Sequence, residues 1–291
     1  MRILTRQASS ILTAQRGGFL AAGPHPFTHS LACYTGCAYG ATSCGLYCYA
    51  AALPNWTFAR PAPETRWGEA VVVKENAPAL LAATLRTMSP DRLAALRIFM
   101  STNTDPYQPP LESRWLLTRR CLEVFAAYDI DLLLIQTRSP LVLRDLDLIA
   151  ALPAAVLSVT VESDDPTLYR RLRGGPPAAQ RLEVVRRALA HGIRTQVAVA
   201  PCLPYTERFA ETLAELGPTR VIVDTLVDGD GTHGRRTAQS PYAALPGWRE
   251  TAHAHALYAD LRDHGLEVGW SDAGFCGIPP RQQGRSDPTY D

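Results

Sequence analysis

Residues 28–50 carry the pattern that decides the fold, and they read THSLACYTGCAYGATSCGLYCYA. Four of the chain's seven cysteines lie in this segment, as Cys33, Cys37, Cys44 and Cys48. The remaining three stand far apart and are expected to be small buried side chains: Cys121, Cys202 and Cys276. Thiolates are soft ligands that suit iron–sulfur clusters and zinc. The clustering therefore predicts a metal centre within residues 33–48.

Three thiolates on one loop after a strand would leave one iron of a [4Fe–4S] cubane without a protein ligand. Such an open iron can bind the amino and carboxylate groups of S-adenosylmethionine (SAM). An electron from the reduced cluster would then break the sulfonium C–S bond. The product, a 5′-deoxyadenosyl radical, can abstract hydrogen from an unactivated carbon.

Two alternatives stay open at this point. Cys33 and Cys37 form one C-x3-C pair, and Cys44 and Cys48 form a second. If all four thiolates bound a cluster, no open iron would remain and the radical chemistry would fail. Four cysteines can also close a structural zinc site, which would make the segment a non-catalytic metal-binding module.

Composition limits the partners. The 291 residues are 46% hydrophobic and carry a formal net charge of +1, so the chain has no overall electrostatic footprint for nucleic acid. This balance favours a small-molecule substrate and makes nucleic acid an unexpected partner. No apolar run is long enough to cross a bilayer and the N-terminus lacks a signal-peptide pattern, so we expect a cytoplasmic protein that does not bind membranes.

Short apolar runs alternate with helical patterns after the cysteine segment. Strands are predicted just before Cys33 and over residues 96–100, 131–136, 156–161, 195–200 and 220–225. Helices are predicted between them, over residues 77–88, 114–128, 140–151, 178–191 and 207–216. This alternation indicates an α/β fold with a parallel sheet, a partial (β/α)6 barrel similar to a TIM barrel. The predicted domains are an N-terminal segment (1–27), the barrel (28–225) and a C-terminal extension (226–291).

The extension has a different texture. Residues 228–231 read DGDG, like part of a calcium loop, but no Glu stands at the required downstream position. A helix over 248–264 and a strand over 266–270 follow, and the last dozen residues read as disordered. This extension is expected to cover the substrate.

Further motifs occur in order along the chain. They are WGE at 67–69, VKENA at 73–77, STNTDPYQP at 101–109, QTRSP at 136–140, RLRGGPP at 171–177 and VAPCLP at 199–204. With the cysteine loop they span residues 28–225 and resemble the spore-photoproduct-lyase-like family of radical SAM proteins. The family's usual cysteine spacing is C-x3-C-x2-C, whereas this loop has C-x6-C-x3-C. Three residues at 41–43 and one between Cys44 and Cys48 account for the difference, and a longer loop can still close around a cubane.

The resemblance implies roles for particular residues. Cys37, Cys44 and Cys48 would hold the [4Fe–4S] cluster. Tyr47 would lie against the adenine of SAM, and Thr104 would lie near the methionyl amino group. Arg138 would pair with the methionyl carboxylate, for which a planar guanidinium is suited. Thr160 would face the ribose, and Glu162 lies on the same strand face two residues on.

Two residues are candidates for the radical chemistry itself. Tyr49 matches a tyrosine implicated in a radical relay, and Cys202 is a candidate hydrogen donor after the fifth strand. Thr102 stands where spore photoproduct lyase needs its donor cysteine, which makes DNA-lesion repair the alternative rather than the first prediction. The resemblance also implies an external electron donor of the flavodoxin or ferredoxin type.

Overall fold

The computed structural model describes residues 1–100, 102–171 and 175–281. Part of the RLRGGPP motif and the tail that was expected to be disordered lie outside these residues. One sheet of eight strands forms the centre, in the order β11-β10-β9-β8-β7-β6-β3-β2. Its strands are β2 (Leu12–Ala14), β3 (His29–Leu31), β6 (Arg97–Met100), β7 (Leu132–Thr137), β8 (Ala155–Thr160), β9 (Thr195–Val199), β10 (Arg220–Val223) and β11 (Val268–Trp270).

The sheet is parallel from β3 to β11, and β2 is antiparallel to β3. All six predicted strands are present, as β3 and β6 to β10, so the predicted α/β partial barrel is confirmed. The strand expected at 266–270 is also present, as β11. It pairs with β10 and continues the main sheet, so this part of the C-terminal extension is built into the barrel.

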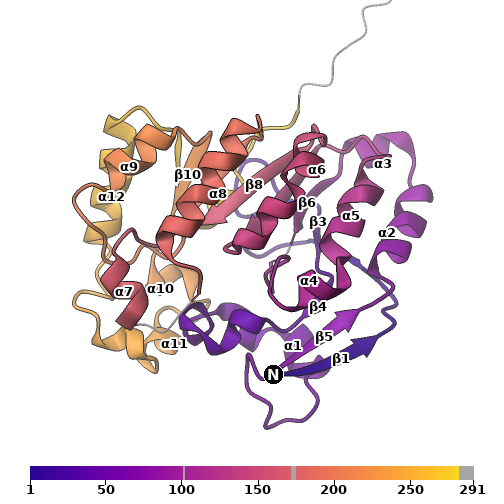
Figure 1. Ribbon diagram of the computed structural model, residues 1–291, viewed down its shortest axis with the longest axis horizontal. Helices are drawn as coiled ribbons and strands as arrows, with labels where there is room; N and C mark the ends of the chain where they lie inside the picture. The colour runs from indigo at the N-terminus through magenta and orange to yellow at the C-terminus, as the bar shows by residue number, and fades with distance from the viewer. Residues whose placement is uncertain (101, 172–174, 282–291) are drawn as a thin grey trace, which may run out of the picture.

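Helices follow the strands and cover the outer face of the sheet. In Figure 1, α9 and α12 lie beside β10 at one end of the sheet, and α2 and α3 lie at the other end. The longer helices are α2 (Ala77–Arg86), α5 (Leu117–Phe125), α8 (Ala178–Ala190), α9 (Phe209–Leu216) and α12 (Ala252–Asp263). The shorter ones are α1 (Pro54–Ala59), α3 (Pro90–Ala94), α4 (Leu111–Trp115), α6 (Leu146–Ala150), α7 (Pro166–Arg171), α10 (Leu226–Gly229), α11 (Arg235–Ala238) and α13 (Ser271–Phe275).

Both faces of the strands are buried, which explains their continuous apolar runs. On β6, Ile98 and Met100 point outward into the core between the sheet and the helices. Phe99, between them, points inward and packs against Phe27, with ring centroids 5.1 Å apart. Phe275 of α13 completes this inner core, so the C-terminal part of the chain helps to fill the barrel.

A second, smaller sheet was not predicted. It joins β1 (Arg2–Arg6), β5 (Ala70–Lys74) and β4 (Tyr34–Thr35), with β5 in the middle. Gly36 follows β4 with φ = +88°, and a Cβ built there would lie 2.6 Å from the carbonyl oxygen of Ala70. Only glycine fits this turn, which delivers the chain from β4 to Cys37.

The loop that resembles a calcium site is organised by hydrogen bonds. Asp230 is fully buried and its carboxylate accepts hydrogen bonds from Thr232, Gly234 and Thr237 at 2.7–3.0 Å. Both carboxylate oxygens are therefore engaged by N–H and O–H donors. This accounts for the DGDG sequence without a metal ion.

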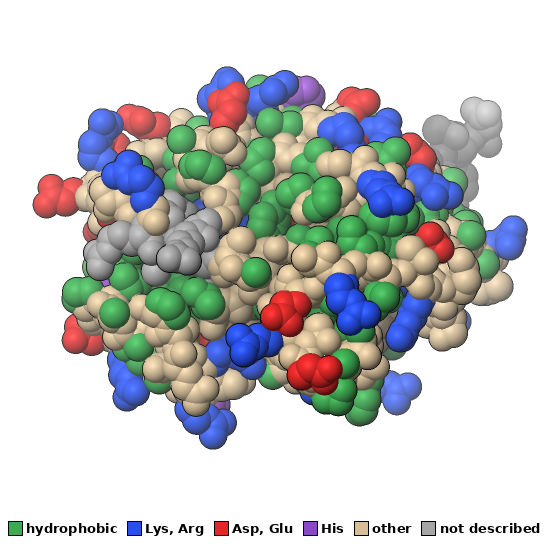
Figure 2. All heavy atoms as spheres, turned by 60° about the horizontal axis from the view of Figure 1, so that its bottom comes forward, with side chains coloured by type: hydrophobic (Ala, Val, Ile, Leu, Met, Phe, Trp, Pro, Cys, Tyr) green, Lys and Arg blue, Asp and Glu red, His purple; other side chains and the backbone are tan. Residues whose placement is uncertain are grey.

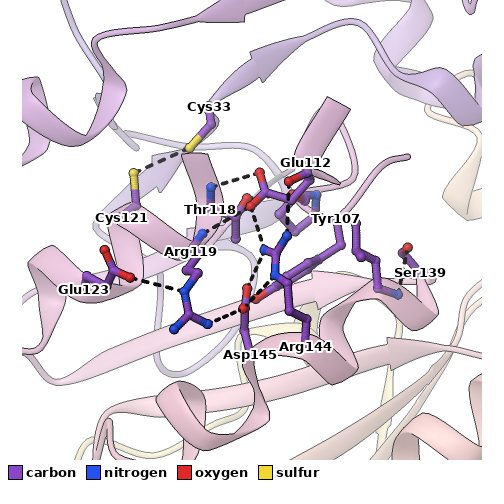
Figure 3. Close-up of polar contacts among 12 residues, drawn as sticks. Cys33, Tyr107, Glu112, Thr118, Arg119, Cys121, Glu123, Ser139, Arg144 and Asp145 are labelled. Carbon is purple, nitrogen blue, oxygen red and sulfur yellow. Dashed lines mark hydrogen bonds and ion pairs between the residues drawn. The ribbon is translucent and has the colours of Figure 1, made fainter. Parts of the chain in front are cut away.

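A buried ionic network ties together the segments that follow β6 and β7 (Figure 3). Glu112 of α4 is fully buried and accepts hydrogen bonds from Tyr34 Oη at 2.5 Å and from the Thr118 backbone at 3.0 Å. Arg144 bridges Glu112, at 3.0 Å, and Asp145, at 2.7 Å. Burial would raise the pKa of Asp145, but hydrogen bonds from Arg144 and Arg119 outweigh it and hold that pKa below its usual value. The network therefore joins β4, α4 and the segment after β7.

Candidate cofactor site

A cavity of about 270 Å³ opens at the carboxyl ends of the parallel strands, where barrel folds build their sites. This volume approaches the range of small-molecule pockets, roughly 300–1,000 Å³. Five successive strands contribute a residue at or just after their ends: Thr104, Arg138, Thr160, Pro201 and Asp224. The cysteine loop closes the cavity from another side. Residues far apart in the sequence thus meet around one space.

The predicted cluster ligands Cys37, Cys44 and Cys48 all line this cavity. Cys37 directly precedes the short 3-10 turn η2 (Ala38–Ala41), Cys44 lies in η3 (Ser43–Leu46), and Cys48 directly precedes η4 (Tyr49–Ala52). The loop is fastened to the segment after β6, because Thr104 Oγ1 donates to the carbonyl of Gly36 at 2.7 Å. The Ala38 backbone N–H also donates to Gln108 Oε1, at 2.6 Å. The longer spacing between the cysteines therefore still brings the three residues to the same space.

The chemistry of these thiols fits a cationic cluster. Burial raises the pKa of Cys37, Cys44 and Cys48, to about 11 for Cys44. For Cys37 and Cys44, repulsion between the neighbouring sulfurs adds to this effect. Three thiolates at these positions are thus unfavourable in isolation and favourable beside positive iron ions.

A single zinc ion fits less well. Across residues 1–100, 102–171 and 175–281, no three Cys, His, Asp or Glu side chains are grouped closely enough to hold one metal ion. A four-cysteine zinc site would need sulfurs about 2.3 Å from one centre. Cys33 is also absent from the cavity wall. A cubane, whose ligands bind separate irons, suits the donor set better than one ion.

The residues expected around SAM are brought together in large part. Tyr47, Thr104, Arg138 and Thr160 line the cavity. The Tyr47 ring is buried and packs edge-on against Tyr242, with centroids 5.1 Å apart. The backbone of Arg138 is fixed by a hydrogen bond, because its backbone N–H donates to Asp105 Oδ2 at 2.9 Å.

Glu162 differs from the expectation. It is only 3% exposed and lies behind the cavity wall, where Arg138 pairs with one carboxylate oxygen and Arg181 with the other. Tyr47 Oη donates to the same carboxylate at 3.1 Å. Burial would raise the pKa of Glu162, but the two guanidinium groups outweigh it and hold that pKa far below its usual value. The structure therefore places Glu162 as a support for Arg138 and Tyr47 rather than as a wall of the cavity.

The two candidate catalytic residues separate. Tyr49 lines the cavity, and its hydroxyl donates to the carbonyl oxygen of Thr102. Cys202 is buried in the core between the sheet and the helices and does not line the cavity. Its position follows Pro201, beyond the last paired residue of β9, where strand alternation no longer fixes the direction of a side chain. The geometry gives no support to Cys202 as a hydrogen donor.

Four acidic residues line the cavity wall and were not predicted as site residues: Asp105, Asp224, Asp228 and Asp272. Asp224 is 6% exposed, and its burial, with the nearby charges of Asp272 and Asp228, raises its pKa to about 7. The sequence held one signal. Asp224 lies near the end of the predicted strand 220–225, at the same edge of the sheet as Thr160.

Comparison with sequences of known proteins bears on this arrangement. Uncharacterized protein MJ0683 of Methanocaldococcus jannaschii is 29% identical over 175 residues, which cover 59% of this chain and 59% of that protein. Uncharacterized protein ORF301 of Acidianus two-tailed virus is 31% identical over 141 residues, 44% of this chain and 46% of the viral protein. The chain thus spans about half the length of the curated relatives that it matches.

Solved structures of spore photoproduct lyase share the fold. A cysteine-to-serine mutant of that enzyme has a TM-score of 0.62 at 13% identity, covering 92% of this chain and 82% of that one. A complex with dinucleoside spore photoproduct has a TM-score of 0.59 at 14% identity and the same coverage. A double mutant with bound AdoMet and that ligand has a TM-score of 0.54 at 14% identity, covering 83% and 76%.

Because these neighbours include complexes with a dinucleoside ligand, the comparisons do not support the expectation that nucleic acid is not a partner. One finding concerns the expectation that the protein does not cross a membrane. Among the described helices, none is long and apolar enough to span a bilayer.

The radical SAM superfamily model matches residues 32–217, more than half of the chain. The match includes the three cavity cysteines and the strand ends that carry Thr104, Arg138 and Thr160. Together with the shared fold, it establishes that this chain belongs to the radical SAM superfamily, whose enzymes use a [4Fe–4S] cluster and S-adenosylmethionine.

Proposed function

We propose that the protein is an enzyme that cleaves SAM reductively and uses the resulting radical on a small organic substrate. Cys37, Cys44 and Cys48 would hold the cluster, which supplies one electron to the sulfonium. SAM and that electron give methionine and a 5′-deoxyadenosyl radical, and the radical takes a hydrogen atom from substrate carbon to give 5′-deoxyadenosine. The observation that carries the proposal is the meeting of Cys37, Cys44 and Cys48 with Arg138 in one cavity.

The chain's own residues would bind and orient SAM. Arg138 would pair with the methionyl carboxylate, since it lines the cavity and its backbone N–H is bound to Asp105. Thr104 would contact the methionyl amino group, and Thr160 would face the ribose. Tyr47 would lie against the adenine, with its hydroxyl anchored on Glu162. Tyr49, on the cavity wall, is the candidate for a redox role.

The acidic wall supports a neutral or positively charged substrate. Asp224, Asp228 and Asp272 line the cavity, and none of the three has an ion-pair partner among the described residues. Such carboxyl groups accept hydrogen bonds from amines and hydroxyl groups, and in their ionised form, which Asp224 adopts above its raised pKa of about 7, they repel phosphates. We therefore expect a small substrate without phosphate groups.

Repair of a DNA lesion is the second candidate, because the fold is shared with spore photoproduct lyase. On the face in Figure 2, Lys and Arg side chains are scattered and interspersed with acidic ones rather than gathered into a stripe. A duplex binder gathers such charges along the phosphate path. Binding of ultraviolet-irradiated DNA at low salt, compared with unirradiated DNA, separates the two candidates.

The proposal is tested by anaerobic reconstitution of the cluster, followed by dithionite and SAM. We expect 5′-deoxyadenosine and methionine in equal amounts, detected by chromatography. A protein that carries iron and sulfide yet forms no 5′-deoxyadenosine would count against it. A physiological reductant of the flavodoxin or ferredoxin type should then replace dithionite.

A further inference from the structure

Arg181 is among the largest fully buried side chains of the described residues, with 1% of its surface exposed. It projects from α8 and donates through Nη1 to the carbonyl oxygen of Thr160 at 2.8 Å. The same nitrogen forms an ion pair with Glu162 Oε2. Burying a guanidinium costs free energy unless the group is paired with a negative charge. The burial of Arg181 behind the cavity wall therefore needs an explanation.

The charges around Glu162 explain why Arg181 is buried there. One carboxylate oxygen faces Arg138 and the other faces Arg181, so the group contains two positive charges and one negative charge. Arg138 lines the cavity and Arg181 does not. If Arg181 were neutral, Glu162 would cancel the charge of Arg138 and leave no net charge on these three residues.

We propose that Arg181 is a positioning residue for SAM: it offsets Glu162, so that the positive charge of Arg138 remains available to the methionyl carboxylate. The inference rests on the proposed function, which assigns that carboxylate to Arg138. Glu162 then serves to orient Arg138 and Tyr47, and Arg181 compensates for the charge that this orientation requires. The bond from Arg181 to Thr160 also holds the end of β8 in place.

A purely structural role for Arg181 makes a different prediction, and a pair of substitutions separates the two. In Arg181→Met the net charge of the group falls to zero. In the double variant Arg181→Met with Glu162→Gln, the net charge returns to +1, although all contacts of Arg181 stay lost. An electrostatic role predicts recovery in the double variant, whereas a structural role predicts none.

The measurement is the dissociation constant of SAM for the reconstituted protein, by equilibrium dialysis under anaerobic conditions. We expect Arg181→Met to weaken binding roughly 10- to 100-fold and the double variant to return to within about threefold of the wild type. Iron content and thermal unfolding are measured in parallel, to confirm that each variant is folded and loaded. Arg181→Lys, which keeps the charge, is the matched control and should bind SAM within about tenfold of the wild type.

A folded, loaded double variant that binds SAM as weakly as Arg181→Met would overturn the inference. If Arg181→Met fails to fold, the lysine variant decides alone. A folded Arg181→Lys with affinity lowered by more than about tenfold would also overturn it. Failure of the wild-type protein to bind SAM would instead reject the proposed function, so the two failures are distinguishable.

Discussion

The sulfur atoms of Cys33 and Cys121 lie 3.6 Å apart in the core between the main sheet and helix α5. Neither residue lines the cavity that holds Cys37, Cys44 and Cys48. The four clustered cysteines are thus divided by the fold into one packing residue and three candidate ligands. This division argues against a site closed by four cysteines.

The division of the four clustered cysteines also predicts which of them are needed for the cluster. Alanine at Cys37, Cys44 or Cys48 should remove most of the iron and sulfide that the reconstituted protein binds, because each thiolate would be the ligand of one iron. Alanine at Cys33 is the matched control and should leave the metal content near that of the wild type. The measurement is iron and sulfide per chain after anaerobic reconstitution. Loss of the cluster in a folded Cys33→Ala protein would revive the four-cysteine alternative.

The buried network in Figure 3 predicts a stability difference between two glutamates. Glu112 is fully buried; its carboxylate accepts hydrogen bonds from Tyr34 and Thr118 and forms an ion pair with Arg144. Glu112→Gln would leave Arg144 partly uncompensated and should lower the free energy of unfolding by about 3 kcal/mol. Glu123, an exposed partner of Arg119, is the control, and Glu123→Gln should cost less than about 1 kcal/mol. Urea unfolding measures both, and equal costs would show that the network does not stabilise the fold.

Asp224 should make stability depend on pH. Its pKa is raised from 3.8 to about 7 by burial and nearby carboxylates, so between these pH values the folded protein keeps a proton that the unfolded chain releases. Stability contributed in this way is complete in acid and is lost as the pH rises toward 7. Asp224→Asn cannot ionise and should gain on the order of 1–4 kcal/mol over the wild type at pH 8, with little difference at pH 4.

Denaturant unfolding at a series of pH values checks this prediction. Asp263→Asn, at an exposed position on α12, controls for the substitution itself. A difference between Asp224→Asn and the wild type that does not change with pH would show that folding does not raise the pKa of Asp224.

The sequence predicts the barrel well because its strands are buried on both faces. Continuous apolar runs mark β6 to β10, and polar residues at their ends mark the site, as with Thr104 and Thr160. The small sheet escapes prediction because β4 has two residues and most of β1 is exposed, so neither has a periodic pattern.

The contacts that a side chain makes behind the cavity wall are harder to predict from the sequence than the face of the strand on which it lies. Alternation places Glu162 on the same face as Thr160, but it cannot tell that Arg181, nineteen residues on, fills the space behind it. Pairings of this kind depend on how a helix packs on the sheet, and the spacing of residues along the chain does not contain that information. Asp228 and Asp272 were missed because both lie in the C-terminal extension, which was predicted to be separate from the barrel.

The central claim is that three cysteines leave one iron of the cluster free for SAM. Electron paramagnetic resonance of the reduced protein, with and without SAM labelled with ¹⁵N at the methionyl amino group, tests it most directly. We predict that SAM changes the spectrum of the cluster and that the labelled nitrogen shows hyperfine coupling to it. A fully loaded cluster whose spectrum is unchanged by saturating SAM would contradict the account.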